Sequence, residues 1–170
     1  MTAKGHVLLA LPFAIEGLNY FGIRSLDGIW LTITIVVGAL FPDIDEPKSY
    51  IGRRFWFMSW PIKLLSKIMP PLKHRGLTHL FFVPLSMGII AHYFENIWLG
   101  GFALGWFLHT VGDLITVGGI QGYLFPFWSN KKMVLLPDSM RFYTGGIVEK
   151  VLISILAVMN GYLIFKLGVI

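Results

Sequence analysis

Histidine and aspartate stand at helical spacing in one apolar stretch of this chain. His109 and Asp113 are four residues apart in GWFLHTVGD, so a helix would place both side chains on one face. Imidazole nitrogens and carboxylate oxygens are ordinary ligands of a zinc-like cation. Ionisable groups within an apolar span are costly and usually mark function. The pair therefore favours a metal site built partly on this helix.

A second group of candidates lies in a predicted turn. Pro42 ends an apolar stretch and leaves Asp43 and Asp45 in an extended or turn segment. There, two carboxylates two residues apart can supply one ligand and one supporting group, or bridge two ions. A DxD motif on its own is more often part of a solvated loop.

The motif HRGLTH adds two imidazoles and a guanidinium. If a helix starts near Gly76, His79 lies in its first turn and His74 lies on the preceding loop beside Arg75. Arg75 is suited to gripping a phosphate or a carboxylate. Alone, this motif reads as a basic loop flanking a membrane, and His109 alone could be an interhelical hydrogen-bonding group. The motifs point to a metal only if the fold brings them together.

Composition places these motifs in a membrane protein. The 170 residues are 55% hydrophobic and 14% charged, whereas soluble domains carry about 25% charged residues. The chain has no cysteine, which excludes disulfides and thiolate ligands. A single domain over 1–170 is expected at this length. The net charge of +5 favours anionic membrane lipids as partners, and no module for direct nucleic-acid binding is evident.

The hydrophobic pattern predicts an all-α integral membrane fold. A spanning helix needs about 20 mainly apolar residues. We expect a bundle of about five transmembrane helices, covering His6–Ile23, Gly28–Phe41, Leu77–Phe94, Ile97–Leu114 and Ile147–Ile170. The stretch Phe55–Pro71 mixes tryptophan with lysine and predicts an interfacial amphipathic helix. The Gly- and aromatic-rich stretch Ile115–Trp128 is read as re-entrant or interfacial.

Threading five spans puts most basic residues on the side that holds the first residues. Twelve of the 14 basic residues fall there, and Arg24 and Lys166 fall on the other side. By the positive-inside rule, this near side should be cytoplasmic. The threading also gathers the unusual polar residues there, including His6 at the start of the first span and Glu149 at the start of the last. Segments far apart in sequence thus deliver imidazoles and carboxylates to one face.

The chain resembles the YdjM-like family, described as LexA-binding, inner membrane-associated, metal-dependent hydrolases. The resemblance runs through TAKGH, LFPDIDEPKSYIGRR, HRGLTH, GWFLHTVGDLIT with the following GG, and RFYTGGIVE. Leu80 stands where the family often has serine after HRGLTH. The resemblance implies a multi-pass bacterial inner-membrane protein and carries over these site residues: His6, Asp43, Asp45, His74, His79, His109, Asp113 and Glu149. LexA binding is implied by the family description alone.

We expect a metal-dependent hydrolase acting at the cytoplasmic face on a phosphoester, such as a lipid headgroup. One or two divalent ions, zinc first and manganese or iron as alternatives, would be held by His6, Asp43, Asp45, His79, His109 and Asp113. The expected catalytic residues are Glu149, His74 and Arg75, and the expected substrate-binding rim is Arg53, Arg54 and Lys73. The His-xxx-Asp pair is also similar to zinc-dependent phospholipase C, over a few ligands.

Two other functions remain open at the level of sequence. The same residues could form a transit or proton-relay site of a transporter, although few polar groups lie on the far side. They could also hold a structural metal that pins the helices of a non-catalytic scaffold. The sequence does not decide the oligomeric state.

Overall fold

The computed structural model describes residues 1–23, 26–68, 75–125, 127 and 131–166, and the chain is mostly helical. The α-helices are α1 (Ala3–Tyr20), α2 (Leu26–Leu40), α3 (Tyr50–Arg54), α4 (Trp56–Ile68), α5 (Phe82–Tyr93), α6 (Ile97–Leu114) and α7 (Ile147–Lys166). Short 3-10 helices cover η1 (Phe41–Asp45), η3 (Leu77–His79) and η4 (Asp138–Met140). Strands β1 (Ile120–Gln121) and β2 (Lys132–Met133) form a small antiparallel pair.

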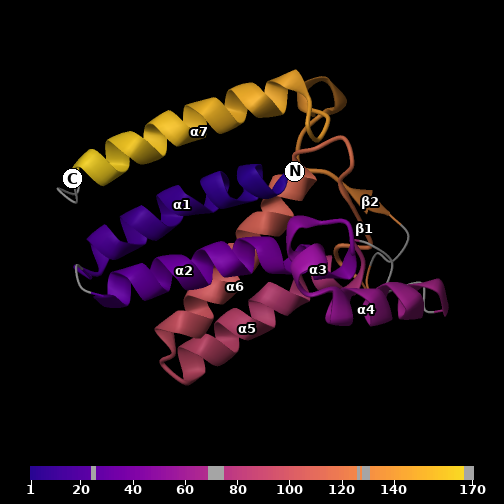
Figure 1. Ribbon diagram of the computed structural model, residues 1–170, viewed down its shortest axis with the longest axis horizontal. Coiled ribbons are helices and arrows are strands. Elements are labelled where there is room, and N and C mark those ends of the chain that lie inside the picture. The colour runs from indigo at the N-terminus through magenta and orange to yellow at the C-terminus, as the bar shows by residue number, and fades with distance from the viewer. Residues whose placement is uncertain (24–25, 69–74, 126, 128–130, 167–170) are drawn as a thin grey trace.

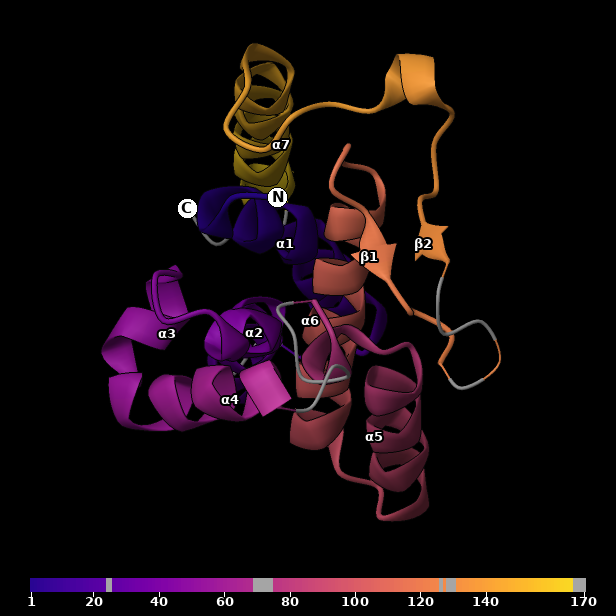
Figure 2. The ribbon, with the colours of Figure 1, turned by 90° about the vertical axis from the view of Figure 1, so that its right-hand side faces the viewer.

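The long helices form a layered bundle with α6 at its centre. Figure 1 shows α7, α1 and α2 side by side, with α5 and α6 below and behind them. Helix α6 packs against α1, α2 and α5, and α7 packs against α1. The Asn160 side chain of α7 donates a hydrogen bond of 3.1 Å to the Leu8 carbonyl of α1. Viewed from the end that holds the N-terminus, α6 lies between α1 and α5 (Figure 2).

Small residues let α2 and α6 approach at backbone distance. A Cβ atom on Gly105 would overlap the carbonyl oxygen of Ile35, and one on Gly38 would overlap the carbonyl oxygen of Phe102. Gly101 lies one turn before Gly105 on the same face, where a Cβ would crowd α2 as well. His109 follows one turn later on this stripe, so the close contact carries its ring to the end of α2.

The described helices agree with the predicted spans at several boundaries, but the third predicted span differs from the helix that the structure shows. Helix α6 has the predicted bounds, and α7 begins at the predicted residue. The expected span Leu77–Phe94 is instead a 3-10 turn followed by α5, which has 12 residues and is about 18 Å long. Residues 77–81 are used to place His79, so the remaining helix is shorter than the roughly 30 Å core of a bilayer.

Two segments of the described chain are long and apolar enough to cross a membrane. They are Leu26–Asp45, with mean hydropathy 1.5, and Ile147–Lys166, with mean hydropathy 1.8. The α7 segment is only 17% buried inside the protein, so its apolar side chains face outward. A five-span bundle is therefore not established by length and composition.

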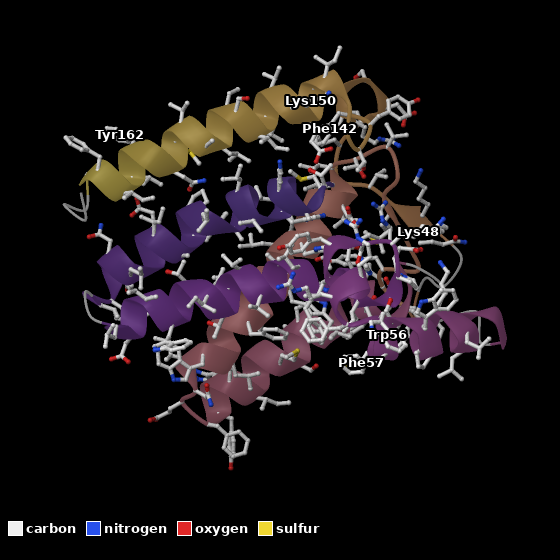
Figure 3. All side chains as sticks on the ribbon, viewed as in Figure 1. Lys48, Trp56, Phe57, Phe142, Lys150 and Tyr162 are labelled. Atoms are coloured by element: carbon white, nitrogen blue, oxygen red, sulfur yellow. The ribbon has the colours of Figure 1, made fainter. Side chains whose placement is uncertain are left out.

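Helix α4 covers most of the stretch Phe55–Pro71 that predicts an interfacial helix, and residues 69–71 lie outside the described chain. Its aromatic side chains Trp56, Phe57 and Trp60 are all more than half exposed. Figure 3 places Lys48 and Lys150 toward the end that holds the N-terminus, and Tyr162 toward the opposite end. The stretch predicted as re-entrant contains β1 and folds over the end of α6 in the described residues.

Because α2 and α6 contact each other at their backbones, one methyl group added at Gly105 should lower the stability of the protein. We expect Gly105→Ala to lower the free energy of unfolding by about 1–3 kcal/mol, because its Cβ would overlap the Ile35 carbonyl. Gly161→Ala is the matched control, since a Cβ there meets nothing within 4 Å. Thermal unfolding in detergent, followed by tryptophan fluorescence, measures both. Equal midpoints for the two variants would contradict the close contact.

Candidate metal centre

Five predicted ligands lie together at the end of the bundle that holds the N-terminus. His6 comes from the first turn and a half of α1, Asp43 from η1, His79 from η3, and His109 and Asp113 from the last two turns of α6. The side chains of His6, His79, His109 and Asp113 are at most 1% exposed, and Asp43 is half-buried. Four segments far apart in sequence, α1, η1, η3 and α6, therefore meet in the interior.

The two imidazoles of His79 and His109 present the same nitrogen to one point. The Nδ1–H of His109 donates to the Ala39 carbonyl at 2.7 Å, which leaves its Nε2 as the lone-pair nitrogen. The Nε2 atoms of the two rings are 3.2 Å apart. At this distance the two nitrogens are bridged either by a proton carried on one of them or by a cation that both lone pairs bind.

A relay fixes the ring of His79 in the same way. The Thr78 hydroxyl donates to the Asp45 carboxylate at 2.9 Å and lies 3.0 Å from His79 Nδ1. Because the hydroxyl proton points to Asp45, the hydroxyl oxygen accepts from the Nδ1–H of His79. The Arg75 backbone N–H also donates to Asp45, at 3.2 Å. Asp45 therefore orients the histidine from behind, and its Oδ2 lies 3.9 Å from His79 Nδ1.

Two carboxylates complete the group around the imidazoles. Asp43 Oδ1 lies 3.9 Å from His79 Nε2 and 3.7 Å from His109 Nε2. Asp113 Oδ2 lies 3.6 Å and 3.8 Å from the same two nitrogens. Two atoms bound to one zinc ion in tetrahedral geometry lie about 3.3 Å apart. The interatomic distances of 3.2–3.9 Å suit a single divalent cation after a small contraction.

His6 stands at the side of this group. Its ring stacks on His109 with centroids 3.7 Å apart and an interplanar angle of 11°, and its Nε2 lies 3.5 Å from Asp113 Oδ1. A Cβ on Gly112 would lie 2.9 Å from His6 Nδ1, so glycine there lets the ring approach α6. Both ring nitrogens are buried without a hydrogen-bond partner in the described residues. Such buried groups are costly, and they fit a site that receives a ligand or an ion.

His6, Asp43 and His109 form a second group of converging ligand atoms. One atom from each of the three lies within 4.8 Å of the others, as also holds for His79, His109 and Asp113. His109 belongs to both groups but has one nitrogen available, because Nδ1 is occupied by the Ala39 carbonyl. The donor set therefore favours one ion that His109 binds through Nε2, with His6 beside it.

Arg75 forms a two-point ion pair with Asp113. Its Nη2 donates to Asp113 Oδ1 at 3.0 Å, and its Nε lies 3.0 Å from Asp113 Oδ2. Its Nη1 donates to the Gly119 carbonyl at 2.9 Å. Arg75 adopts a left-handed backbone conformation, with φ of 60°, which is unfavourable for a side chain this large. Its side chain is 21% exposed.

The residues that follow α6 fold back over the end of that helix. The Tyr123 hydroxyl lies 3.2 Å from the Thr110 hydroxyl on α6, and burial raises the pKa of Tyr123. Lys132 donates to the Val117 carbonyl at 2.5 Å. These contacts, with the bond from Arg75 to Gly119, hold the segment that contains β1 and β2 over the end of α6 (Figure 2).

Glu149 lies apart from the converging ligands in its contacts. Its carboxylate accepts hydrogen bonds from the Thr2 N–H at 2.6 Å, from the Thr2 hydroxyl at 2.8 Å and from the Gly145 N–H at 2.5 Å. The group is fully buried. These bonds join the start of α7 to the start of α1, the helix that carries His6.

The remaining predicted residues lie outside the cluster or outside the described chain. Arg53 and Arg54 are exposed at the end of α3, and the Arg53 Nε donates to the Ser49 carbonyl. Lys73 and His74 fall outside the described residues. Sequence reasoning missed Thr78 and the Ala39 carbonyl. The position of Thr78 beside His79 in HRGLTH was a signal for the hydroxyl, but no sequence pattern marks a carbonyl.

Comparisons with known proteins agree on one family. The family model described as YdjM inner membrane protein matches residues 1–168. The inner membrane protein YdjM of Escherichia coli (strain K12) is 30% identical over 151 residues, covering 81% of this chain and 72% of that protein. The uncharacterized protein YvsG of Bacillus subtilis (strain 168) is 31% identical over 170 residues, covering 98% of this chain and 96% of that protein. No solved structure is significantly similar.

The contacts of Glu149 predict a structural effect that can be measured without any ligand. We expect Glu149→Ala to lower the free energy of unfolding by about 1–3 kcal/mol for each buried donor that is left unpaired. Glu16→Ala is the control, because Glu16 is an exposed carboxylate on α1. Chemical unfolding in detergent compares the two. If both variants unfold like the wild type, Glu149 does not brace the helix ends.

Proposed function

The chain belongs to the family of YdjM inner membrane proteins, and from this premise we propose that it is a membrane-bound, metal-dependent hydrolase. The observation that carries the proposal is the meeting of His79 Nε2 and His109 Nε2, 3.2 Å apart, beside two carboxylates. Hydrogen bonds hold both rings with the lone pair turned to the same point. Metal centres typically use such hydrogen bonds to fix the tautomer and the orientation of each histidine ligand.

The proposed ligands are Asp43, His79, His109 and Asp113, with zinc as the first candidate ion. A divalent ion in this position supplies an activated water and polarises the bond to be cleaved. Asp45 keeps the role of orienting His79 through Thr78. The sequence prediction that Asp45 itself ligates the ion stays untested, and its contacts favour the supporting role.

His6 and Arg75 are the residues we propose to act on the substrate. The His6 ring is buried next to Asp113 and has no hydrogen-bond partner in the described residues, so the one ring nitrogen that carries a lone pair is available to take up a proton. The partly exposed Arg75 side chain holds its guanidinium beside the Asp113 carboxylate, where it can neutralise charge that develops on a phosphoryl oxygen. Glu149 is proposed as a positioning residue, because three hydrogen bonds already satisfy its carboxylate.

A phosphoester is the substrate class that this environment favours. The anionic group would meet Arg75 at the site, and the exposed Arg53 and Arg54 lie on α3, next to the segment that carries Asp43. The exposed aromatic side chains of α4 suit the headgroup region of a membrane. A lipid-derived phosphoester at the membrane surface would satisfy both features.

We propose that α1, α2, α5, α6 and α7 all lie within the bilayer and that the metal site faces the cytoplasm. The near end carries Lys48 and Lys150, as the positive-inside rule requires for a cytoplasmic face (Figure 3). Helix α6 has 18 residues and is about 27 Å long, so the turn between α5 and α6 lies about one hydrocarbon thickness from the site, in the far interfacial region.

Metal content tests the proposal directly. We expect the purified protein to hold about one zinc, manganese or iron ion per chain, because both groups of converging ligand atoms share the single available nitrogen of His109. His109→Gln and Asp113→Asn should lose the ion and any phosphodiesterase activity on phospholipid vesicles. Thr78→Val should weaken metal affinity by about 10–100-fold, since it breaks the relay to His79. Elemental analysis and metal titration measure both effects.

The matched control is His92→Gln, which removes an exposed imidazole at the opposite end of α5. Circular dichroism and gel filtration of each variant separate loss of metal from loss of fold. A wild-type protein that stays metal-free after reconstitution with all three ions would refute the metal centre. A stoichiometric ion without hydrolysis of any phosphoester would leave a structural metal and refute the enzyme.

The orientation can be tested because the chain has no cysteine of its own. We expect Lys48→Cys to react with a maleimide only after the membrane is permeabilised, because the near end should be cytoplasmic. Tyr20 lies at the far end of α1 and is 85% exposed in the wild type. Tyr20→Cys should therefore react with an impermeant maleimide in intact cells that lack an outer membrane, or in cells whose outer membrane alone has been permeabilised. The opposite labelling pattern would place the site on the outer face.

A further inference from the structure

An apolar groove lies in the half of the molecule opposite the metal site. Its volume is about 860 Å³, within the range of about 300–1,000 Å³ of ligand sites. Helices α1 and α5 flank it, with Phe13 and Phe21 on one side and Ile89 on the other. Its floor includes Leu31 and Ile35 of α2 and Gly101 of α6. None of the proposed ligands lines it, so the groove and the metal site are separate.

Exposed apolar side chains border the groove, which shows that it opens outward. Phe13 is 50% exposed, Phe21 64% and Ile89 61%. On the proposed topology, these side chains face the hydrocarbon of the bilayer. The medium next to the groove is then lipid, and an acyl chain is the ligand that the surroundings supply at high local concentration.

One end of the groove is polar and is formed by the turn between α5 and α6. His92, Glu95 and Asn96 line this end. The Asn96 side chain is used in capping α6, where it accepts from the Leu99 N–H. Glu95 is exposed, and within the described ranges its carboxylate has no ion-pair or hydrogen-bond partner. Among the described residues, the end of the groove therefore carries one carboxylate without a paired cation.

Glu95 also occupies a backbone conformation that favours glycine. Its φ is 50°, at the left-handed position that ends α5. A side chain there costs of order 1–2 kcal/mol compared with an ordinary helix position. Strain of this kind, at a carboxylate facing a cavity, suggests a binding role.

We propose that the groove binds one acyl chain of a phospholipid whose amine-bearing headgroup contacts the Glu95 carboxylate. The apolar walls suit the chain, and the charge at the far end selects an ammonium over an anionic headgroup. Helix α6 is about 27 Å long and separates this carboxylate from the metal-site end, so on the proposed topology Glu95 lies in the far interfacial region, at the depth of a headgroup amine. The inference rests on the proposed membrane topology but not on the metal or the hydrolase activity.

The decisive experiment measures lipid retained by the purified chain in nanodiscs of equal parts phosphatidylethanolamine and phosphatidylglycerol. After transfer to mild detergent, native mass spectrometry counts the lipids on each protein. We expect the wild type to retain about one phosphatidylethanolamine per chain, as the groove volume suits one ligand. Gly88→Leu should lose it, because Gly88 lines the groove and a Cβ there meets nothing within 4 Å.

The matched control is Gly161→Leu, which adds the same side chain at an open position on α7, outside the groove. Glu95→Gln should keep a lipid but lose the preference for the amine, whereas Glu16→Gln should keep that preference. Metal content of each variant reports separately on the hydrolase site. Two outcomes would overturn the proposal. In the first, Gly88→Leu retains as much lipid as the wild type. In the second, the lipid retained by the wild type has the same composition as the nanodisc mixture. If Gly88→Leu fails to fold, the comparison of Glu95→Gln with the wild type decides the question.

Discussion

The carboxylate of Asp113 is the group on which the arrangement of this chain depends. It is 1% exposed, and an ionised carboxylate in such a place is unstable unless donors and cations surround it. The Met1 nitrogen donates to it, Arg75 grips both of its oxygens, and three imidazoles lie within 3.8 Å of it. These partners come from α1, the loop before η3, η3 and α6. One buried charge therefore holds together segments that are more than one hundred residues apart in sequence.

The helix packing follows from the need to bring partners this close. Gly38 and Gly105 allow α2 and α6 to touch at their backbones, and this contact brings the Ala39 carbonyl to within 2.7 Å of His109. Gly112 does the same for His6 against α6. Larger residues at these positions would move the imidazoles outward by a side-chain width. The small residues thus serve the polar cluster as much as the apolar core.

Patterns local to one helix were predictable from the sequence, and contacts between segments were predictable only in part. The i, i+4 spacing of His109 and Asp113 predicted their common face, and the bounds of α6 agree with the apolar run that contains them. The length of α5 was wrongly predicted, because residues 77–81 form a 3-10 turn that carries His79 and do not continue the helix. The roles of Asp45 and Thr78 depend on a relay between two segments, and sequence spacing contains no such information. Sequence spacing predicts Glu149 at the start of the last span as a catalytic group, whereas its contacts in the structure are backbone and hydroxyl donors.

The two ends of the bundle carry opposite solutions to the problem of charge in an apolar environment. At the near end, several carboxylates are compensated by imidazoles, a guanidinium and backbone donors, which leaves a preorganised set of lone pairs. At the far end, Glu95 stands at the mouth of an apolar groove without a described partner. A buried cluster that neutralises itself can hold a small cation, whereas a lone carboxylate at an interface attracts a larger amphiphilic one. Under the two proposals, the same physical requirement, compensation of negative charge away from water, is met by a metal at one end of the bundle and by a lipid amine at the other.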